Sequence, residues 1–254
     1  MPSRSIAVIP ARGNSKRVPA KNKRYIAGKP MIGWVIEAAV LSGVFDDVVV
    51  DSEDAEILRI AEIFGATPHL RQPVHSQDHV QQNIPVTYAL RHMQQMEQFS
   101  GKTWDYVCML TSAAPMTTAE FIRKTHTAFI DSGKRQLYCI REEGHLRHAA
   151  KPVGGNPAQG LARLFDPSLV GVQSNDNVEK WYLPAPNLRW YKYEDMVNGD
   201  AKTFGGYYDE DTFGYVVPRE LTVDIDEELD FRFAEMLLNQ RRAREATTYE
   251  YQPD

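Results

Sequence analysis

The sequence has few cysteines and no long hydrophobic run. Its 254 residues include 2 cysteines, Cys108 and Cys139, which form neither a CxxC pair nor a cluster with histidine. This pattern argues against a disulfide framework and a structural zinc site, and we expect both cysteines to be buried. The most apolar run near the N-terminus, residues 6–11, is too short to span a membrane, and no signal-peptide pattern is present. We therefore expect a cytoplasmic protein.

Acidic residues are absent from the first 36 positions, which contain eight Lys and Arg residues. The whole chain is nevertheless acidic, with 29 Lys and Arg against 34 Asp and Glu and a formal net charge of −5 at pH 7. An acidic total argues against a nucleic-acid partner or an anionic membrane surface, because both favour a basic surplus. The basic charge near the N-terminus is therefore a local feature.

Short apolar runs alternate with segments of helical periodicity. Three runs are typical of buried strands: residues 5–10, 47–50 and 106–110. Three segments between or after these runs show helical spacing: residues 30–43, 52–65 and 117–129. Ser52 and the capping box at residues 117–120 are start signals for the last two, and glycine ends the first two. Strands that are apolar on both faces and separated by helices predict an α/β fold, with a doubly wound, mainly parallel sheet and helices on both faces.

The pattern changes between about residues 141 and 214, which are rich in glycine, proline, asparagine and aromatic residues. We interpret this segment as a hairpin-rich excursion within a single domain of residues 1–254, forming a dimer contact or a wall of the substrate site. Its aromatic residues, such as Trp190 and Tyr191, can either stack on a sugar or fill a buried core. Residues 222–225 predict a last strand before a terminal helix.

The loop after the first strand contains four cations within ten positions: Arg12, Lys16, Arg17 and Lys21. Ligands of open parallel sheets bind outside the carboxyl ends of the strands, so this loop is a candidate binding site. Gly13 permits close approach of the backbone, and such a density of cations without a carboxylate suits a polyphosphate. The loop is neither a GxGxxG fingerprint nor a Walker loop. A solvated basic loop is the alternative interpretation.

The stretch VIPARGNSKRVPAKN at residues 8–22, followed by GKPMI at residues 28–32, resembles the signature of the acylneuraminate cytidylyltransferase family. This family includes the synthetases of CMP-sialic, CMP-pseudaminic and CMP-legionaminic acids. The similarity covers about residues 5–116 and 222–238. It implies a Rossmann-like nucleotidyltransferase fold and a homodimer. It also implies that the anomeric hydroxyl of a nonulosonic acid attacks the α-phosphate of CTP, giving a CMP-sugar and pyrophosphate.

The resemblance assigns roles to individual residues. Arg12 and Lys21 match catalytic phosphate-binding positions. The nucleotide-binding set that it implies is Ala11, Arg12, Gly13, Lys16, Arg17, Lys21, Asn22, Arg71, Thr111 and Ser112. Asp224 and Asp226 match metal ligands, and two carboxylates two positions apart on a strand end point to the same face and suit Mg²⁺. Without the resemblance, Asp226 could be a helix cap and Asp224 a solvated residue.

The carboxylate of a sugar acid requires a cation or amide donors in its pocket. Candidates lie in or near the irregular segment: Arg141, Arg163, Asn187 and Arg189. Taken singly, each of the arginines is more typical of a surface residue than of a ligand site.

The chain departs from the family pattern at several positions. Residues 111–115 read TSAAP where relatives usually have QPTSP, and Glu53 replaces an aspartate. The Ala-Pro ending resembles the pseudaminic acid branch. Two alternatives to the main hypothesis stay open: a cytidylyltransferase for another sugar acid such as 3-deoxy-octulosonate, and a nucleotide-binding relative without turnover.

Overall fold

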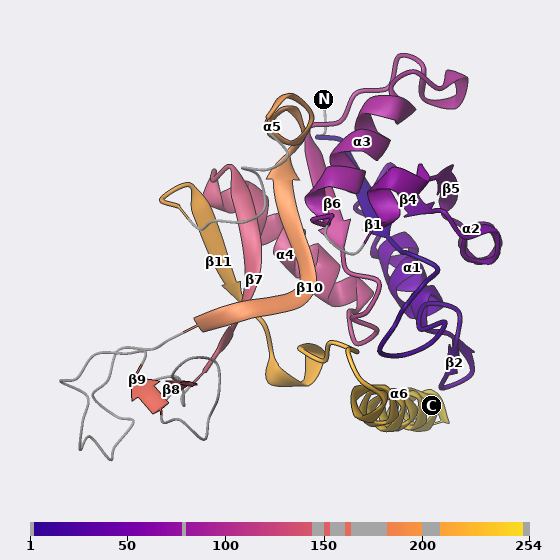
Figure 1. Cartoon of the computed structure of the whole chain (residues 1–254), viewed down its shortest axis with the longest axis vertical. Helices are drawn as coiled ribbons and strands as arrows, with labels where there is room; N and C mark the ends of the chain where they lie inside the picture. Colours follow the sequence, from indigo (N-terminus) through magenta and orange to yellow (C-terminus); the bar gives the residue numbers. More distant parts are fainter. Residues whose placement is uncertain are drawn as a thin grey trace.

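The computed structural model describes residues 3–77, 80–143, 150–152, 161–163, 182–199 and 209–250. Its centre is a seven-stranded sheet with the order β11-β7-β10-β6-β1-β4-β5 (Figure 1). These strands are β1 (Ser5–Pro10), β4 (Asp47–Ser52), β5 (Thr67–Leu70), β6 (Tyr106–Leu110), β7 (Gln136–Glu142), β10 (Tyr182–Lys192) and β11 (Thr212–Val216). Two small antiparallel pairs join β2 (Tyr25–Ile26) to β3 (Lys29–Pro30), and β8 (Ala150–Pro152) to β9 (Leu161–Arg163).

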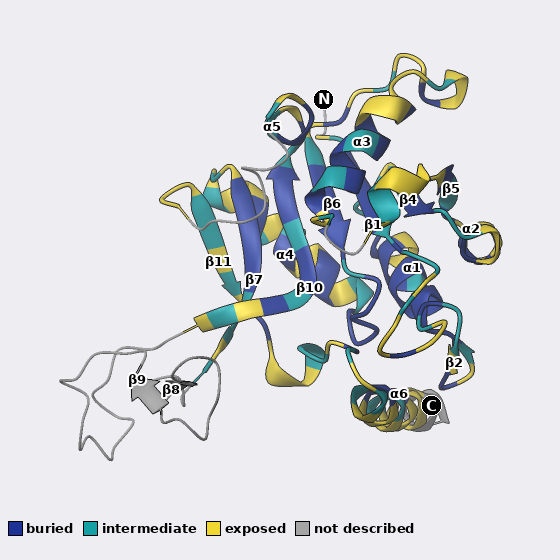
Figure 2. Cartoon of the chain, in the orientation of Figure 1, coloured by how far each residue is buried: buried dark blue, intermediate teal, exposed yellow. Residues whose placement is uncertain are grey.

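Helices cover both faces of the sheet. One face packs against α1 (Met31–Ser42), α2 (Ala55–Ile63) and α4 (Ala119–Ser132). The other face packs against α3 (Asn83–Met93) and the short α5 (Tyr193–Asn198). The central strands are buried while the outer sides of the helices are exposed (Figure 2). The doubly wound α/β prediction is therefore confirmed, and no helix in the described ranges is long and apolar enough to cross a membrane.

Strand β10 changes the interpretation of the segment 141–214. It lies inside the sheet, antiparallel to both β6 and β7, whereas the other neighbouring pairs are parallel. Trp190 packs into the core on one face and Tyr191 into the core on the other, and both side chains are fully buried. A strand that is buried on both faces and bulged between Pro184 and Arg189 shows no clean alternation, so its sequence looked irregular. The prediction that this whole segment leaves the sheet was therefore wrong for β10.

An antiparallel strand pair does occur within that segment. The β8–β9 pair lies beyond one end of β7 and β10, away from the layers of helices (Figure 1). Trp181 lies outside the described residues. The aromatic side chains of β10 that the structure describes as buried belong to the core, so they do not form a sugar-stacking wall.

The helices begin and end at residues close to the predicted caps. Helix α1 ends at Gly43, whose φ of 67° is the left-handed conformation that glycine adopts without strain. Helix α2 is capped by Asp54, which accepts the N–H groups of Glu56 and Ile57, and Ser52 instead accepts the N–H of Asp54. Thr118 caps α4 by accepting the Phe121 N–H, one residue after the predicted cap.

The predicted strand at residues 222–225 is absent. A short 3₁₀ helix η7 (Arg219–Leu221) leads into an extended segment and then α6 (Glu228–Glu250). The Ile225 N–H donates to the Ala113 carbonyl, so this segment crosses the loop after β6 and does not pair with an edge strand. Asp230, rather than Asp226, accepts the N–H groups before α6. Phe231 and Leu238 of α6 pack against Val18, Ile26 and Met31 near the N-terminus.

Candidate active site

A cavity of about 450 Å³ lies at the carboxyl ends of β1 and β6. The chain order reverses there, because β4 and β5 lie on one side of β1 and β6 on the other. Such switch points are the usual ligand sites of open α/β sheets. The walls come from four segments: the loop after β1, the residues after β5, the loop after β6 and the segment before α6.

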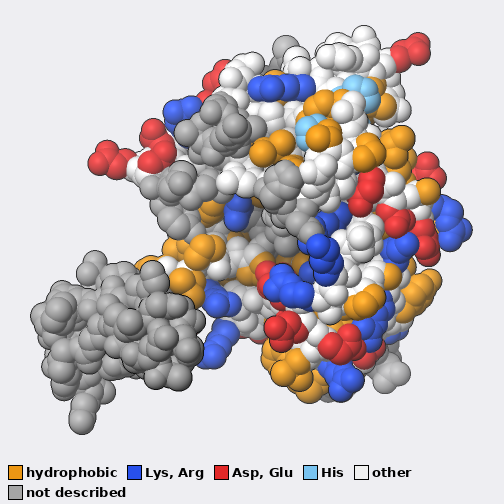
Figure 3. All heavy atoms as spheres, viewed as in Figure 1, with side chains coloured by type: hydrophobic (Ala, Val, Ile, Leu, Met, Phe, Trp, Pro, Cys, Tyr) orange, Lys and Arg blue, Asp and Glu red, His pale blue; other side chains and the backbone are white. Residues whose placement is uncertain are grey.

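Positive side chains line this cavity. All four cations of the loop after β1 contribute to its wall: Arg12, Lys16, Arg17 and Lys21. Figure 3 shows Lys and Arg side chains gathered in the middle of this face of the molecule, beside acidic ones. Asn22, Arg71, Thr111 and Ser112 line the same cavity, so the fold brings most of the predicted nucleotide-binding set together.

Ala11 and Gly13 support the cavity from behind its wall. Ala11 is buried, and its N–H donates to the Asp51 carbonyl at 2.9 Å, which extends the pairing of β1 with β4. The Gly13 N–H donates to Glu53 Oε1 at 2.8 Å. A Cβ atom at Gly13 would lie 2.5 Å from Asp54 Oδ2, so the close approach of the loop to the start of α2 requires glycine.

Lys21 is held against the segment before α6. Its Nζ donates to the Ile225 carbonyl and lies 3.9 Å from Asp226 Oδ1. Burial lowers the pKa of the Lys21 ammonium, and the nearby carboxylates of Asp224 and Asp226 offset only part of this effect. The lysine therefore contributes a fixed cation at the wall of the cavity.

Asp224 and Asp226 approach the basic loop from the other end of the chain. Arg17 Nη2 donates to Asp226 Oδ1 at 2.7 Å. Although Asp224 faces solvent within the cavity, the atoms crowded around it raise the pKa of its carboxyl, and the carboxylate of Asp226 raises it further. Two oxygen ligands of like charge thus lie near each other, on a wall that also carries cations.

Asn22 offers a buried acceptor at the cavity. Its Nδ2 donates to the Arg12 carbonyl at 2.9 Å, which holds the basic loop in place. Its Oδ1 is buried and accepts no hydrogen bond from the protein. A buried acceptor without a partner is costly, so a donor on a bound ligand would satisfy it.

Similarity to known proteins agrees with this geometry. The sequence profile of the family described as cytidylyltransferase matches residues 6–154, which is more than half of the chain. This chain belongs to the cytidylyltransferase family.

Relatives extend the match across the chain. The cytidylyltransferase is 29% identical over 240 residues to the pseudaminic acid cytidylyltransferase of Campylobacter jejuni, covering 92% of this chain and 96% of that protein. It is 27% identical over 236 residues to N-acylneuraminate cytidylyltransferase A of Danio rerio, covering 90% of this chain and 49% of that protein. The structure of CMP:2-keto-3-deoxy-manno-octonic acid synthetase complexed with CTP has the same fold, with a TM-score of 0.64 and 18% identity over 94% of this chain and 100% of that one.

Of the predicted sugar-acid residues of this cytidylyltransferase, the three whose side chains the structure describes, Arg141, Asn187 and Arg189, are not among the residues that line the cavity. Asn187 is fully buried, and its Nδ2 donates to Thr117 Oγ1 at 3.2 Å and to the Leu221 carbonyl at 2.8 Å. The Arg189 guanidinium lies 4.9 Å from the centroid of the Tyr138 ring. Arg141 is on β7, and the side chain of Arg163 lies outside the described part of the structure. Their role in sugar-acid binding stays a prediction.

Sequence reasoning missed the wall that follows Arg71. This wall extends from the 3₁₀ helix η1 (Pro73–Ser76) to the start of α3, and its cavity-lining residues are His75, Ser76, Gln77, Val80, Gln82 and Pro85. The available signal was the polar cluster of Gln, His and Ser directly after a residue already assigned to the nucleotide.

Proposed function

We propose that this cytidylyltransferase transfers the CMP group of CTP to the anomeric hydroxyl of a nonulosonic acid. The observation that supports this most directly is one cavity at the switch point of the sheet, with four cations of one loop facing two carboxylates from the opposite end of the chain. The relatives named for pseudaminic and N-acylneuraminic acids support the class of acceptor.

The cations would bind the triphosphate. Arg12, Lys16, Arg17 and Lys21 are placed to neutralise its charge and that of the leaving pyrophosphate. The acceptor hydroxyl oxygen forms a bond to the α-phosphorus of CTP and loses its proton to the solvent, and the bond between this phosphorus and the bridging oxygen of the β-phosphate breaks. The products are a CMP-sugar and pyrophosphate.

Asp224 and Asp226 fit a magnesium ion. Carboxylate oxygens are the ligands that Mg²⁺ prefers. Burial raises the pKa of the Asp224 carboxyl and the carboxylate of Asp226 raises it further, and a cation would offset the repulsion between these two groups. Bound there, Mg²⁺ would add positive charge next to the phosphates. Arg17 now pairs with Asp226, so it would be released toward the triphosphate when Asp226 binds a metal.

The nucleoside would contact the other walls of the cavity. The unpaired Oδ1 of Asn22 would accept a hydrogen bond from it, and Arg71 would donate one. Thr111 and Ser112 would line the same part of the site. Ala113, next to them in the loop after β6, also lines the cavity.

Assembly and location are parts of the same proposal. We propose a homodimer that involves residues 141–214, supported by the β8–β9 pair that lies away from the main layers (Figure 1). A cytoplasmic location is supported by the two cysteines, which are both free and buried. Light scattering coupled to size-exclusion chromatography would measure the mass in solution, and the mass of a monomer would contradict the dimer.

Turnover tests the reaction itself. The protein is incubated with CTP, Mg²⁺ and a panel of pseudaminic, N-acetylneuraminic, legionaminic and 3-deoxy-octulosonic acids, and pyrophosphate and CMP-sugars are measured. We expect product with at least one nonulosonic acid. Product with 3-deoxy-octulosonate alone would move the activity to another sugar acid. CTP binding by calorimetry without any product would identify a nucleotide-binding relative without turnover.

Asp226→Asn tests the metal site. The amide keeps the size of the side chain but removes its charge, so we expect a loss of turnover of at least the ~10–100-fold typical of a disturbed metal site. The unfolding midpoint should stay close to that of the parent. Asp131→Asn, at an exposed position of α4, is the matched control and should retain full activity. An unchanged rate in Asp226→Asn would remove this residue from the metal site.

A further inference from the structure

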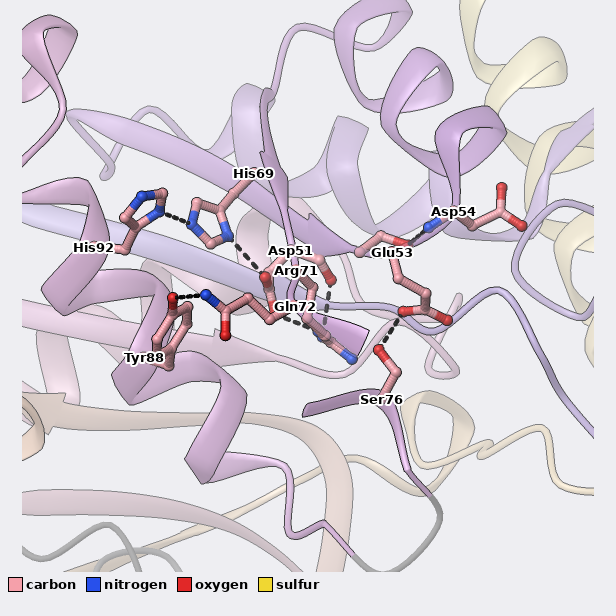
Figure 4. Close-up of polar contacts among 10 residues, drawn as sticks. Asp51, Glu53, Asp54, His69, Arg71, Gln72, Ser76, Tyr88 and His92 are labelled. Carbon is pink, nitrogen blue, oxygen red and sulfur yellow. Dashed lines mark hydrogen bonds and ion pairs between the residues drawn. The ribbon is translucent and has the colours of Figure 1, made fainter. Parts of the chain in front are cut away.

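A chain of four polar side chains leads from the cavity into the β4–β5 edge of the sheet (Figure 4). Arg71 donates from Nε to Asp51 Oδ2 at 2.6 Å and from Nη2 to the Asp51 carbonyl at 2.8 Å. Asp51 Oδ1 lies 2.8 Å from His69 Nδ1. His69 Nε2 lies 2.9 Å from His92 Nδ1, so this series of polar contacts extends to α3.

The sheet itself places these residues together. Asp51 on β4 and His69 on β5 are direct partners in the parallel ladder, and the Arg71 N–H donates to the Ser52 carbonyl just after β5 ends. Asp51 is 1% exposed, His69 2% and Arg71 6%. A charged pair this deeply buried is costly unless its hydrogen bonds are satisfied, and here the carboxylate is bound on both sides.

The two histidines extend the network through their ring nitrogens. If His69 donates from Nδ1 to Asp51, its Nε2 is an acceptor, and this acceptor matches a proton on Nδ1 of His92. One neutral tautomer of each ring therefore satisfies every contact. The negative charge of Asp51 then balances Arg71 alone.

The Arg71 guanidinium lies at the cavity wall, where it can bind a ligand. A guanidinium has five N–H groups, and Asp51 accepts two of those on Arg71, so the other three are available at the cavity wall. Because Nε and Nη2 are both held, the guanidinium plane is fixed before a ligand binds. Preorganisation of this kind reduces the entropy cost of binding.

We propose that Asp51, His69 and His92 are positioning residues that hold Arg71 for the nucleoside part of CTP. This inference rests on the proposed function, because it takes CTP as the ligand of the cavity. The three residues act only through Arg71. Their loss should therefore weaken CTP binding without slowing the transfer step.

The alternative is a purely structural role in joining β4, β5 and α3. The two roles differ in kinetics. A group that aids binding in the ground state and the transition state equally changes KM and leaves kcat unchanged. A structural role would lower the unfolding midpoint and would not single out CTP.

The first experiment measures the Kd of CTP by calorimetry, together with kcat and the KM of each substrate. We expect Asp51→Asn to raise the Kd and KM for CTP about tenfold, which corresponds to about 1.4 kcal/mol. The kcat and the KM for the sugar acid should stay within about twofold of the parent, since both report on other contacts. Unchanged CTP binding in Asp51→Asn would overturn the proposal.

Conservative variants separate positioning from folding. In His69→Asn the amide nitrogen can take the place of Nδ1, so CTP binding should be largely retained, whereas His69→Ala should weaken it. His92 is exposed, so His92→Phe should fold, keep its contact with Tyr88 and weaken CTP binding by a smaller factor. His126→Phe, on α4 and away from the cavity, is the matched control and should bind CTP as the parent does. Equal loss in His69→Asn and His69→Ala would overturn the proposal.

A double-mutant cycle gives the sharpest result. In an Arg71→Ala background, Asp51→Asn should cause no further loss of CTP binding, because its effect passes through the guanidinium. A loss that persists in this background would overturn the positioning role. A parent protein that does not bind CTP would instead overturn the proposed function, which keeps the two failures distinct.

Discussion

Single side chains from distant parts of the sequence define the cavity. Arg17 and Asp226 are 209 positions apart and form a hydrogen bond of 2.7 Å. Glu53 has a similar joining role. Its Oε1 accepts the Gly13 N–H at 2.8 Å. Its Oε2 accepts the Ser76 hydroxyl at 2.7 Å, and Figure 4 shows this second contact. Glu53 thus connects the basic loop to η1, which are two walls of the cavity.

We expect the length of the Glu53 side chain to matter for CTP binding, because its two oxygens accept hydrogen bonds from two walls of the cavity. We predict that Glu53→Asp raises the Kd for CTP by about 3–10-fold, because the shorter side chain cannot hold both partners and a hydrogen bond is worth about 1 kcal/mol. Glu53→Gln is the matched control: its amide oxygen can accept from Gly13 and its amide nitrogen can donate to Ser76. Calorimetry with CTP measures both variants, and equal losses in the two would contradict a requirement for length.

Elements begin and end where local chemistry permits. Thr118 has an extended backbone and its hydroxyl accepts the Phe121 N–H at 3.1 Å, while Thr117 is buried and accepts a hydrogen bond from Asn187. Both threonines fit a capping motif by sequence. Only one of them faces the free N–H groups of α4, because the other is bound to the β10 bend.

The Thr118 cap should stabilise helix α4. Thr118→Ala should lower the free energy of unfolding by about 1 kcal/mol, since an N–H group of the first turn loses its acceptor. Thr118→Ser retains the hydroxyl and should remain close to the parent. Urea denaturation followed by circular dichroism measures both. Equal stability of the alanine and serine variants would show that the cap contributes little.

The whole molecule depends on a strand from late in the chain. Strand β10 forms the ladder that joins β7 and β11 to the block of β6, β1, β4 and β5. Its Trp190 stacks on Phe45 at 5.4 Å between ring centroids and donates from Nε1 to Thr125 Oγ1 at 3.1 Å. The two parts of the sheet therefore share one core only when β10 is in place.

Truncation tests this dependence. A fragment of residues 1–143 contains five of the seven strands of the central sheet, β1, β4, β5, β6 and β7, and it lacks β10 and β11. We predict that it shows no cooperative unfolding transition, because β7 loses both of its partner strands and Trp190 is missing from the core. Urea titration of the fragment and the full chain in parallel measures this. A sharp transition in the fragment would show that the N-terminal part folds alone.

Local signals were sufficient for several elements. The strands at residues 5–10 and 106–110 were predicted with their observed bounds, and α1 ends at the predicted Gly43. The cation-rich loop after the first strand was predicted to be a candidate binding site, and its four cations line the cavity. Apolar runs, a glycine stop and a cluster of like charges are each properties of neighbouring residues, so sequence alone determines them.

Other features were decided by long-range contacts. The place of β10, the absence of a strand at residues 222–225 and the link from Asp51 through His69 to His92 all depend on which distant segment lies alongside. A strand buried on both faces has no alternation to reveal it, and a buried carboxylate is explained only by partners that the folded chain supplies. The basic loop and the alternation of strands and helices can thus be read from neighbouring residues. What faces that loop depends on the folded chain, because no local period encodes which strands pair across the sheet.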